Sequence, residues 1–336
     1  MCYTNTRCRV KIRGELTPPF DIQGGLKQGC PLSTLLFNLT LEWIMRHTRP
    51  TRTPMVIGNA TIDRLAYADD VDLCGEDIEE VAETYQEFRD SARRTGLQIN
   101  ATKTKVMKVT RGQEMVDELQ LGEQRIEAVQ SFKYLGSTVT SNNLVEEEIG
   151  IRIGAGSRCS WALNDTLRSR MLSRATKTQI YTAIIRPVVL YGCETWRLTK
   201  ESERRLEVFE RSILRRIWGP VWDNERREWR RRHNEELVRV SQLPTISNVV
   251  RSHRLRWAGH VARMEDGCLA RDLMLGTPRG RRPLGRPRKR WVDNIKEDVR
   301  QLGVEPEEWI ETARNRPRWR KLVKAAKEQT GPQPPE

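Results

Sequence analysis

The stretch Tyr67-Ala68-Asp69-Asp70 decides how the first half of this chain is interpreted. It lies between two segments of β character, residues 62–65 and 71–73, which places the two aspartates at the tip of a hairpin. Neighbouring carboxylates repel each other unless cations lie between them, and hard oxygen ligands of this kind suit a divalent metal. Because an Asp-Asp pair is also frequent in ordinary turns, the surrounding sequence has to decide between a metal site and a turn.

Around this stretch, up to about residue 140, strand and helix patterns alternate. Asp77 and Glu80 form a capping-box arrangement that predicts the start of a helix, and Gly96 predicts its end. A Gly-rich loop at 24–33 precedes another helix, which carries Leu35, Leu36, Leu39 and Trp43 on one face. Short strands are predicted at residues 8–13, 20–22, 55–57, 62–67, 71–74, 97–99, 105–109, 119–121, 125–126 and 132–134. These patterns predict a mixed α+β fold.

Beyond Asn143 the pattern becomes helical. Helices are predicted near 145–170, in a segment capped by Ser173 that carries Ile180, Ile184 and Ile185, near 200–218, and from about 289 to 327. Residues 278–290 are too rich in Gly, Pro and charge to pack, so they predict an extended arm, and residues 331–336 predict a disordered tail.

Charge is divided unevenly along the chain. Residues 1–150 carry 18 Lys and Arg against 22 Asp and Glu, a net charge of −4, whereas residues 151–336 carry 41 against 23, a net charge of +18. Such a basic half predicts nucleic acid as a partner. Nine of the ten tryptophans also lie in this half, several beside arginines. They either stack on single-stranded bases or anchor helices in the core, with solvated arginines around them.

Several classes of protein are excluded by composition. No run approaches the 18 apolar residues of a membrane span, and the first residues have no apolar segment of a signal peptide, so we expect a nuclear or cytoplasmic protein with no membrane partner. The seven cysteines are scattered without a Cys-x-x-Cys pair, which predicts reduced thiols and no disulfide-linked partner. His253 and His260 have only Cys268 nearby in the sequence, too little for a zinc site.

The order of motifs around the aspartates resembles the reverse transcriptases of non-LTR (LINE-like) retrotransposons. A Lys-Gln-Gly-x-Pro loop at 27–31 is followed by a helix, by Tyr-Ala-Asp-Asp at 67–70, by Gly-Leu-x-Ile-Asn-x-x-Lys-Thr at 96–104 and by Phe-Lys-Tyr-Leu-Gly at 132–136. Three segments further along the chain are also similar to later regions of such proteins. They are Leu190-Tyr191-Gly192-Cys193-Glu194-Thr195-Trp196, residues 256–264 and residues 291–293. Group II intron maturases and telomerases share the Tyr-x-Asp-Asp motif but resemble the sequence after 145 less well.

The resemblance implies a partial right-hand polymerase palm at 1–143, a helical thumb-like region at 144–220 and a basic, mostly helical nucleic-acid-binding region at 221–336. It implies RNA-directed DNA synthesis on an RNA template and a DNA primer, with Mg²⁺ as cofactor. The residues that it assigns are the metal-binding and catalytic Asp69 and Asp70, the catalytic Lys103, the substrate-binding Gln28, Gly29, Pro31 and Tyr67, and the primer-grip residues Phe132, Lys133, Tyr134, Leu135 and Gly136.

The family takes a further metal-binding aspartate from a segment upstream of the Lys-Gln-Gly loop, and Asp21 and Asp63 lie in the wrong contexts to replace it. The sequence therefore predicts an N-terminally truncated polymerase that is inactive in isolation. The alternative is a non-catalytic nucleic-acid-binding protein derived from a retrotransposon.

The basic arm offers a separate binding hypothesis. Residues 285–288, Gly-Arg-Pro-Arg, followed by Lys289 and Arg290, resemble the Arg-Pro core of an AT-hook, in which Arg286 and Arg288 would enter the narrow minor groove of A·T-rich DNA. A solvated basic linker is the alternative.

Overall fold

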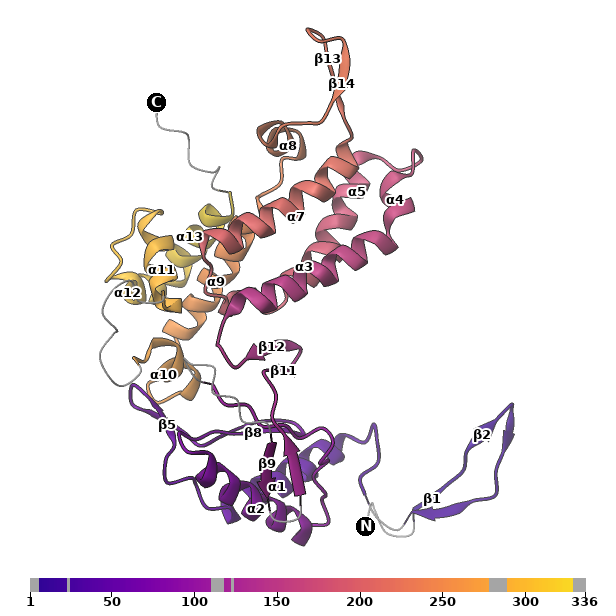
Figure 1. The fold of residues 1–336 in the computed structure, drawn as a ribbon, viewed down its shortest axis with the longest axis vertical. Coiled ribbons are helices and arrows are strands. Elements are labelled where there is room, and N and C mark those ends of the chain that lie inside the picture. The colour runs from indigo at the N-terminus through magenta and orange to yellow at the C-terminus, as the bar shows by residue number, and fades with distance from the viewer. Residues whose placement is uncertain (1–5, 23–24, 110–117, 122–123, 278–288, 329–336) are drawn as a thin grey trace. The chain divides into compact units, whose positions relative to one another are not determined.

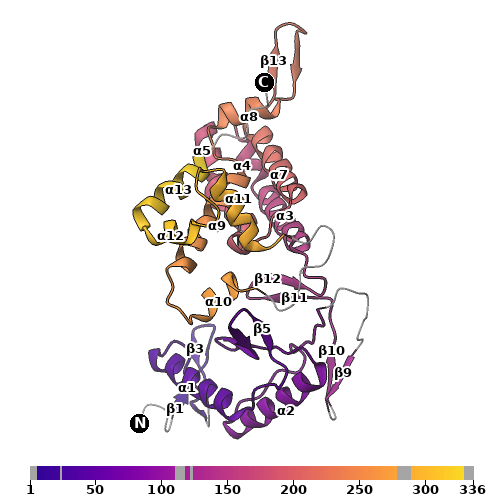
Figure 2. The same ribbon diagram turned by 90° about the vertical axis from the view of Figure 1, so that its left-hand side faces the viewer.

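The fold was derived from a computed structural model that describes residues 6–22, 25–109, 118–121, 124–277 and 289–328 (Figures 1 and 2). The chain divides into two compact units: unit 1 comprises residues 1–55, 61–104 and 118–127, and unit 2 comprises residues 56–60, 105–117 and 128–336. Helices and strands occur together, as the α+β prediction requires. Residues 278–288 of the predicted arm, which was expected over 278–290, and the predicted tail at 331–336 lie outside the described residues.

The strands of the first part of the chain form antiparallel pairs, and every sheet in the described residues has two strands. The pairs are β1 (Thr6–Cys8) with β4 (Phe20–Ile22), β2 (Lys11–Ile12) with β3 (Glu15–Leu16), β5 (Met55–Ile57) with β6 (Ala60–Ile62), β7 (Arg64–Tyr67) with β8 (Asp70–Leu73), and β9 (Glu118–Leu121) with β10 (Gln124–Glu127). The expected strands at 97–99 and 105–109 are absent. Leu97 and Ile99 pack against a core cluster instead, and Val106 makes a single bridge to Ala128.

Two helices of 17 residues form the core of unit 1. In α1 (Pro31–His47), Pro31 stands at the first helical position, where its missing N–H costs nothing. In α2 (Ile78–Arg94), the carboxylate of Asp77 accepts from the backbone N–H of Glu79. The prediction that Asp77 caps this helix is thus confirmed. In a full capping box Glu80 would accept from the backbone N–H of Asp77, but here its carboxylate accepts from the backbone N–H of Arg52.

The apolar face of α1 differs from the expected one. Ile44 is the buried residue of this helix, and Leu41 and Met45 pack beside it against Phe88 and Ala92 of α2. Leu35, Leu39 and Trp43, which the spacing placed on one face, are exposed instead.

Unit 2 is mainly helical beyond the hairpin of β11 (Ser131–Tyr134) and β12 (Ser137–Thr140). Figure 1 shows α3 and α7 running alongside each other, with α4 and α5 near one of their ends. The further elements are α3 (Val145–Ala162), α4 (Asn164–Arg168), α5 (Arg174–Ile180), the π-helix Tyr181–Ile185, α6 (Arg186–Val189), the 3₁₀ turn Cys193–Thr195, α7 (Lys200–Trp218), β13 (Val221–Asp223), β14 (Glu228–Arg230), α8 (Asn234–Ser241), α9 (Ile246–Ala262), α10 (Leu269–Leu275), α11 (Trp291–Arg300), α12 (Trp309–Arg314) and α13 (Arg316–Glu328).

Local signals account for several of these bounds. Ser173 Oγ accepts from the backbone N–H of Thr176, and α7 covers the predicted range and ends at Gly219. The helix expected over 289–327 is broken into three. The first break, between α11 and α12, follows from Gly303, which adopts a φ of 73°, and from Pro306 close behind it, and the second lies at the extended Asn315. None of the helices in the described ranges has the length and apolar character needed to cross a bilayer.

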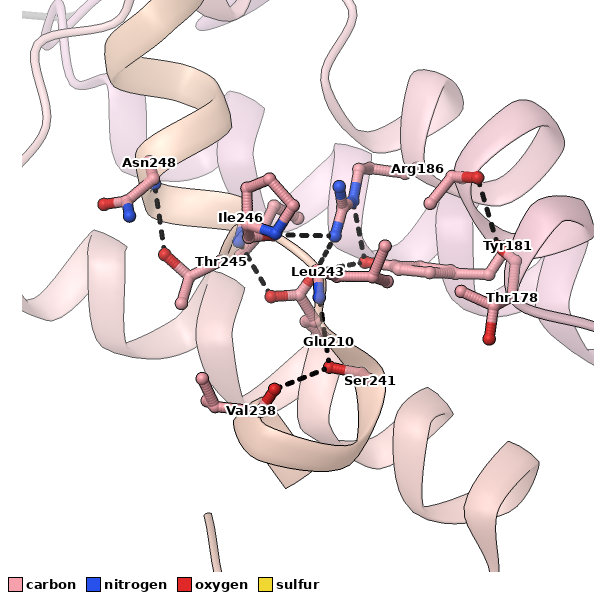
Figure 3. Close-up of polar contacts among 12 residues, drawn as sticks. Thr178, Tyr181, Arg186, Glu210, Val238, Ser241, Leu243, Thr245, Ile246 and Asn248 are labelled. Carbon is pink, nitrogen blue, oxygen red and sulfur yellow. Dashed lines mark hydrogen bonds and ion pairs between the residues drawn. The ribbon is translucent and has the colours of Figure 1, made fainter. Parts of the chain in front are cut away.

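A buried polar network joins three helices inside unit 2 (Figure 3). Arg186 pairs with Glu210, whose second carboxylate oxygen accepts from the backbone N–H of Ile246 at 2.7 Å. Tyr181 donates its hydroxyl to Glu210 at 2.7 Å, and Arg186 also donates to the carbonyl of Pro244. The network ties α6, α7 and the start of α9 together, because a buried charge is stable only with such partners.

The C-terminal helices pack around α9. Trp309 and Trp319 are each 2% exposed, and the indole of Trp319 donates to the carbonyl of Leu255. Gly259 permits this packing, since a Cβ there would lie 2.1 Å from the Trp319 indole nitrogen. These tryptophans are core anchors, as one of the two interpretations held, whereas Trp161 and Trp229 are 66% and 67% exposed.

Candidate active site and nucleic-acid interface

The two aspartates lie at the tip of the β7–β8 hairpin, as predicted. Tyr67 pairs with Asp70, which leaves Ala68 and Asp69 as a two-residue turn. Ala68 adopts a φ of 54°, in the left-handed region that residues other than glycine seldom occupy. Strain of this kind persists only where the surrounding structure imposes it, and it is concentrated at functional sites.

The hairpin is anchored by its apolar side. Val71 and Leu73 pack against the core cluster of α1 and α2, and alternation along the strand therefore directs Asp70 and Asp72 to the opposite side. Arg64, at the other end of the hairpin, pairs with Asp63 at 2.5 Å and donates to the carbonyls of Met45 and Thr48 at the end of α1. These contacts hold the tip in a fixed relation to the helices.

The carboxylates of Asp69 and Asp70 are exposed, and neither makes an ion pair or a hydrogen bond within the described part of the chain. Tyr67 beside them is 66% exposed. Adjacent carboxylates without cationic partners are a donor set that suits Mg²⁺, which is commonly bound through one or two carboxylates together with substrate phosphates. The residues present therefore fit the metal that the sequence implies.

The half-buried thiol of Cys74 follows β8 at the base of this hairpin. Burial raises the pKa of Cys74 to about 12, and the nearby carboxylates of Asp72 and Asp63 contribute to that rise. Burial also raises the pKa of Asp72, against the effect of its hydrogen bond with Cys74. The alternation of residues 70–73 was the available signal for Asp72, since it places this residue on the same side of the strand as Asp70.

The Gln28-Gly29 turn begins α1. The backbone N–H of Cys30 donates to the carbonyl of Lys27, and the hydroxyl of Ser33 donates to the same carbonyl at 2.6 Å. Gly29 adopts a φ of 83° with open space around it, and both Gln28 and Gly29 are exposed. The turn therefore presents backbone with little side chain at the start of the helix.

Lys103 lies in a turn built on Asn100, the asparagine of the motif at 96–104, to which the sequence assigned no role of its own. The side chain of Asn100 accepts from the backbone N–H groups of Thr102 and Lys103, and its carbonyl accepts from Thr104. This leaves the Lys103 side chain exposed. Within the described residues, no hydrogen bond or ion pair joins Lys103 or Gln28 to the two aspartates, although all of them belong to unit 1.

The predicted primer-grip residues form the β11–β12 hairpin of unit 2. Leu135 and Gly136 have φ values of 48° and 86°, as a tight two-residue turn requires. The tip is held by Tyr191, whose hydroxyl donates to the carbonyl of Leu135 at 2.9 Å, and by Arg152, which donates to the carbonyl of Gly136. Phe132 and Lys133 are exposed on this anchored hairpin.

The last two residues of the predicted arm, Lys289 and Arg290, make local contacts in the structure. Lys289 forms an ion pair with Glu297, and the backbone N–H of Arg290 donates to Asp293 at the start of α11. Arg286 and Arg288 lie outside the described residues.

The structure also brings His253 close to the adjacent pair Cys193 and Glu194, which lies about 60 residues earlier in the sequence. Cys193 Sγ lies 3.5 Å from His253 Nδ1, and the ligand atoms of Cys193, Glu194 and His253 lie within 4.8 Å of one another. Burial and the nearby Glu194 raise the pKa of Cys193 to about 12, whereas burial and Arg256 lower the pKa of His253. The sequence search for zinc ligands considered only Cys268, because 60 residues separate Cys193 from His253.

Comparison with known proteins shows what the first part of the chain is similar to. Residues 2–139 match the reverse transcriptase (RNA-dependent DNA polymerase) family. A transposon-derived protein of Caenorhabditis elegans is 25% identical over 80% of this chain and 98% of its own length. Two RNA-directed DNA polymerases from Drosophila melanogaster are each 25% identical to this chain. The match to the X-element polymerase covers 76% of this chain, and the match to the polymerase of the mobile element jockey covers 63%.

The chain spans 28% and 24% of the X-element and jockey polymerases. The matched range contains the Gln28-Gly29 turn, the Asp69-Asp70 tip, the Asn100 turn and the β11–β12 hairpin. Residues 2–139 are therefore similar to the reverse transcriptase domain of the polymerases that such mobile elements encode.

Proposed function

We propose that this chain acts in RNA-directed DNA synthesis, with Asp69 and Asp70 holding Mg²⁺ at the tip of the β7–β8 hairpin. The observation that carries the proposal is the pair of exposed carboxylates without cationic partners on a hairpin that Val71, Leu73 and Arg64 fix to the helices. Bound there, Mg²⁺ would neutralise the phosphates of a nucleoside triphosphate and the charge that develops on them.

The other assigned residues would position the reactants. Gln28, Gly29 and Pro31 would line the incoming nucleotide and the template, because the positive φ of Gly29 leaves the backbone accessible. The exposed ammonium of Lys103 would approach the triphosphate, and the anchored tip at Leu135 and Gly136 would hold the primer end.

Primer extension tests this function. Full-length protein is incubated with Mg²⁺, dTTP and an oligo(dT) primer on poly(rA), beside a variant with Asp69→Ala and Asp70→Ala. A variant with Glu83→Ala and Asp90→Ala removes the same charge from exposed positions of α2 and serves as the control. Synthesis that only the hairpin variant loses supports the proposal. Equal synthesis by both variants contradicts it. Absence of synthesis by the unchanged protein agrees instead with the prediction from the sequence that this chain is inactive in isolation.

The basic half supports a second candidate, nucleic-acid binding without catalysis. Residues 151–336 carry a net charge of +18, and counterion release then makes binding strongly dependent on salt. Two results together favour this candidate: the unchanged protein synthesises no DNA, and the Asp69→Ala, Asp70→Ala variant still binds oligonucleotides. Loss of binding when both aspartates are replaced contradicts it.

A further inference from the structure

Two adjoining pockets share one face of α9. The larger, of about 910 Å³, lies between the β11–β12 hairpin, the segment around Tyr191 and α9. The smaller, of about 370 Å³, lies between α9 and α13. Both are lined by Arg256, His260 and Arg263, which recur at the spacing of a single helix face. We call the two pockets together the α9 groove.

The cations of this groove differ from the other arginines of α9. Arg251 and Arg254 share Asp298 as an ion-pair partner, with nitrogen to oxygen distances of 3.1 Å and 2.7 Å. Arg256 and Arg263 form no ion pair in the described part of the chain, although Glu194 lines the larger pocket. The helix therefore has one face whose arginines pair with a carboxylate and one face whose arginines do not.

A second helix adds to that charge. Arg316 and Arg320 are one turn apart on α13, line the smaller pocket, and likewise have no ion pair among the described residues. Gly259 brings α13 close to α9, since only hydrogen fits against Trp319 there. Burial, with Arg316 and Arg320 close by, lowers the pKa of Arg263. These like charges repel one another at such short range. A bound polyanion would relieve the repulsion, so the site favours a polyanionic ligand.

Aromatic rings lie beside these cations. Tyr191 is 51% exposed in the larger pocket, with the Arg152 guanidinium 4.5 Å from its ring centre. The ring of Trp257 lies 5.3 Å from that of His260. A pocket of this volume falls within the range of about 300–1,000 Å³ that is typical of small-molecule sites, and it therefore has room for a nucleobase.

We propose that the α9 groove binds single-stranded nucleic acid. Arg256, Arg263, Arg316 and Arg320 contact successive phosphates, and an unstacked base occupies the pocket beside Tyr191 and Trp257. Guanidinium groups match phosphate oxygens in pairs, and aromatic rings accept any base by stacking. An acidic peptide would satisfy the arginines but would leave the aromatic pocket unused. This inference rests on the proposed nucleic-acid function and assigns it to specific residues.

The phosphate contacts are tested with the full chain and a fluorescein-labelled 20-nucleotide oligo(dT), by anisotropy over a series of salt concentrations. A variant with Arg316→Ala and Arg320→Ala is compared with one carrying Arg318→Ala and Lys321→Ala. The second pair is exposed on the same helix, carries the same charge and lines neither pocket. Each phosphate contact in a single strand contributes about 0.7 to the slope of log K against log salt, so we expect the groove variant alone to lose about 1.4. Equal slopes for the two variants would overturn the assignment.

The base pocket is tested with Tyr191→Leu and Tyr191→Phe against oligo(dT) and an abasic 20-mer. The Phe variant loses the bond to Leu135 but keeps the ring, which separates stacking from structural damage. We expect the unchanged protein and the Phe variant to prefer oligo(dT) at least fivefold, and the Leu variant to lose that preference. Equal binding of both oligomers by the unchanged protein, or equally effective competition by inorganic polyphosphate, would overturn the base pocket. If the unchanged protein binds no oligomer, the proposed nucleic-acid function itself fails.

Discussion

Arg186 donates to Glu210 at 2.6 Å inside the helical core, where their side chains are 7% and 6% exposed. Replacement of Glu210 by Ala leaves the guanidinium buried without its counter-ion, so we expect a loss of about 3–5 kcal/mol in the free energy of unfolding. Urea denaturation followed by circular dichroism measures the loss.

A double variant with Arg186→Met and Glu210→Leu is the control for this pair. Because it removes both charges at once, it should lose less stability than Glu210→Ala alone. Losses that add between the two positions would show that the pair is not coupled.

The Cys193 thiol predicts an alkaline loss of stability. Its pKa is raised to about 12 in the folded protein, from an ordinary value of 9.0. A raised folded pKa gives a stabilisation that is complete below pH 9 and is lost as the pH rises toward 12, because the unfolded chain ionises first. At about 1.36 kcal/mol per pKa unit, the loss approaches 4 kcal/mol.

Cys193→Ala should therefore make the decline in stability between pH 9 and pH 12 smaller, measured by urea denaturation at several pH values, while the part that comes from Cys74 remains. Cys159→Ala, at a half-buried cysteine of α3, is the matched control and should keep the decline. The same pH dependence in all three proteins would contradict the assignment to Cys193.

Two glycines of α3 should respond oppositely to alanine. At Gly154 a Cβ would meet only the end of Arg158 at 3.6 Å, so Gly154→Ala should stabilise by about 0.5–1 kcal/mol through helix propensity. At Gly156 a Cβ would lie 2.2 Å from Val189 and 2.9 Å from Phe209. Gly156→Ala should thus destabilise by about 1–3 kcal/mol. Shifts of the same sign in thermal unfolding would contradict the packing of α3.

Predictions from the sequence succeeded where the cause was local. The tip at Asp69 followed from two short strands around a polar pair, the helix after Ser173 from a capping hydroxyl, and the end of α7 from Gly219. Each depends on residues within a few positions of one another, so the pattern alone determined the outcome.

Where the cause was tertiary, the sequence was insufficient. Leu97 and Ile99 have the pattern of a strand, yet they pack on the cluster around Phe88 and find no partner strand. The α9 groove unites Arg256 with Arg316, which are 60 residues apart, so no spacing rule could join them. Between 221 and 275 the sequence predicted a mostly helical region without bounds for its elements, because α9 is buried on several sides and has little amphipathic contrast.

The arm at 278–290 yields the last prediction, which rests on sequence because residues 278–288 lie outside the described ranges. If Arg286 and Arg288 enter a minor groove, changing both to Ala should weaken binding to A·T-rich duplexes more than to G·C-rich ones. The physical reason is that the narrow A·T groove concentrates negative potential around an inserted guanidinium. Changing both to Lys should also weaken binding, since the hydrated ammonium lacks the planar fork.

Competition binding of the full chain at fixed ionic strength measures the A·T to G·C affinity ratio of each variant. Lys289 offers a matched control, because its ammonium already pairs with Glu297. Lys289→Ala removes one positive charge from the same segment and should leave the ratio unchanged. If the arm is a solvated linker, changing Arg286 and Arg288 to Ala should lower the affinity for both duplexes equally. Changing both to Lys should then leave the affinity almost unchanged. A ratio that the Ala substitutions leave unchanged would therefore assign the arm to nonspecific phosphate contacts, which depend on charge alone.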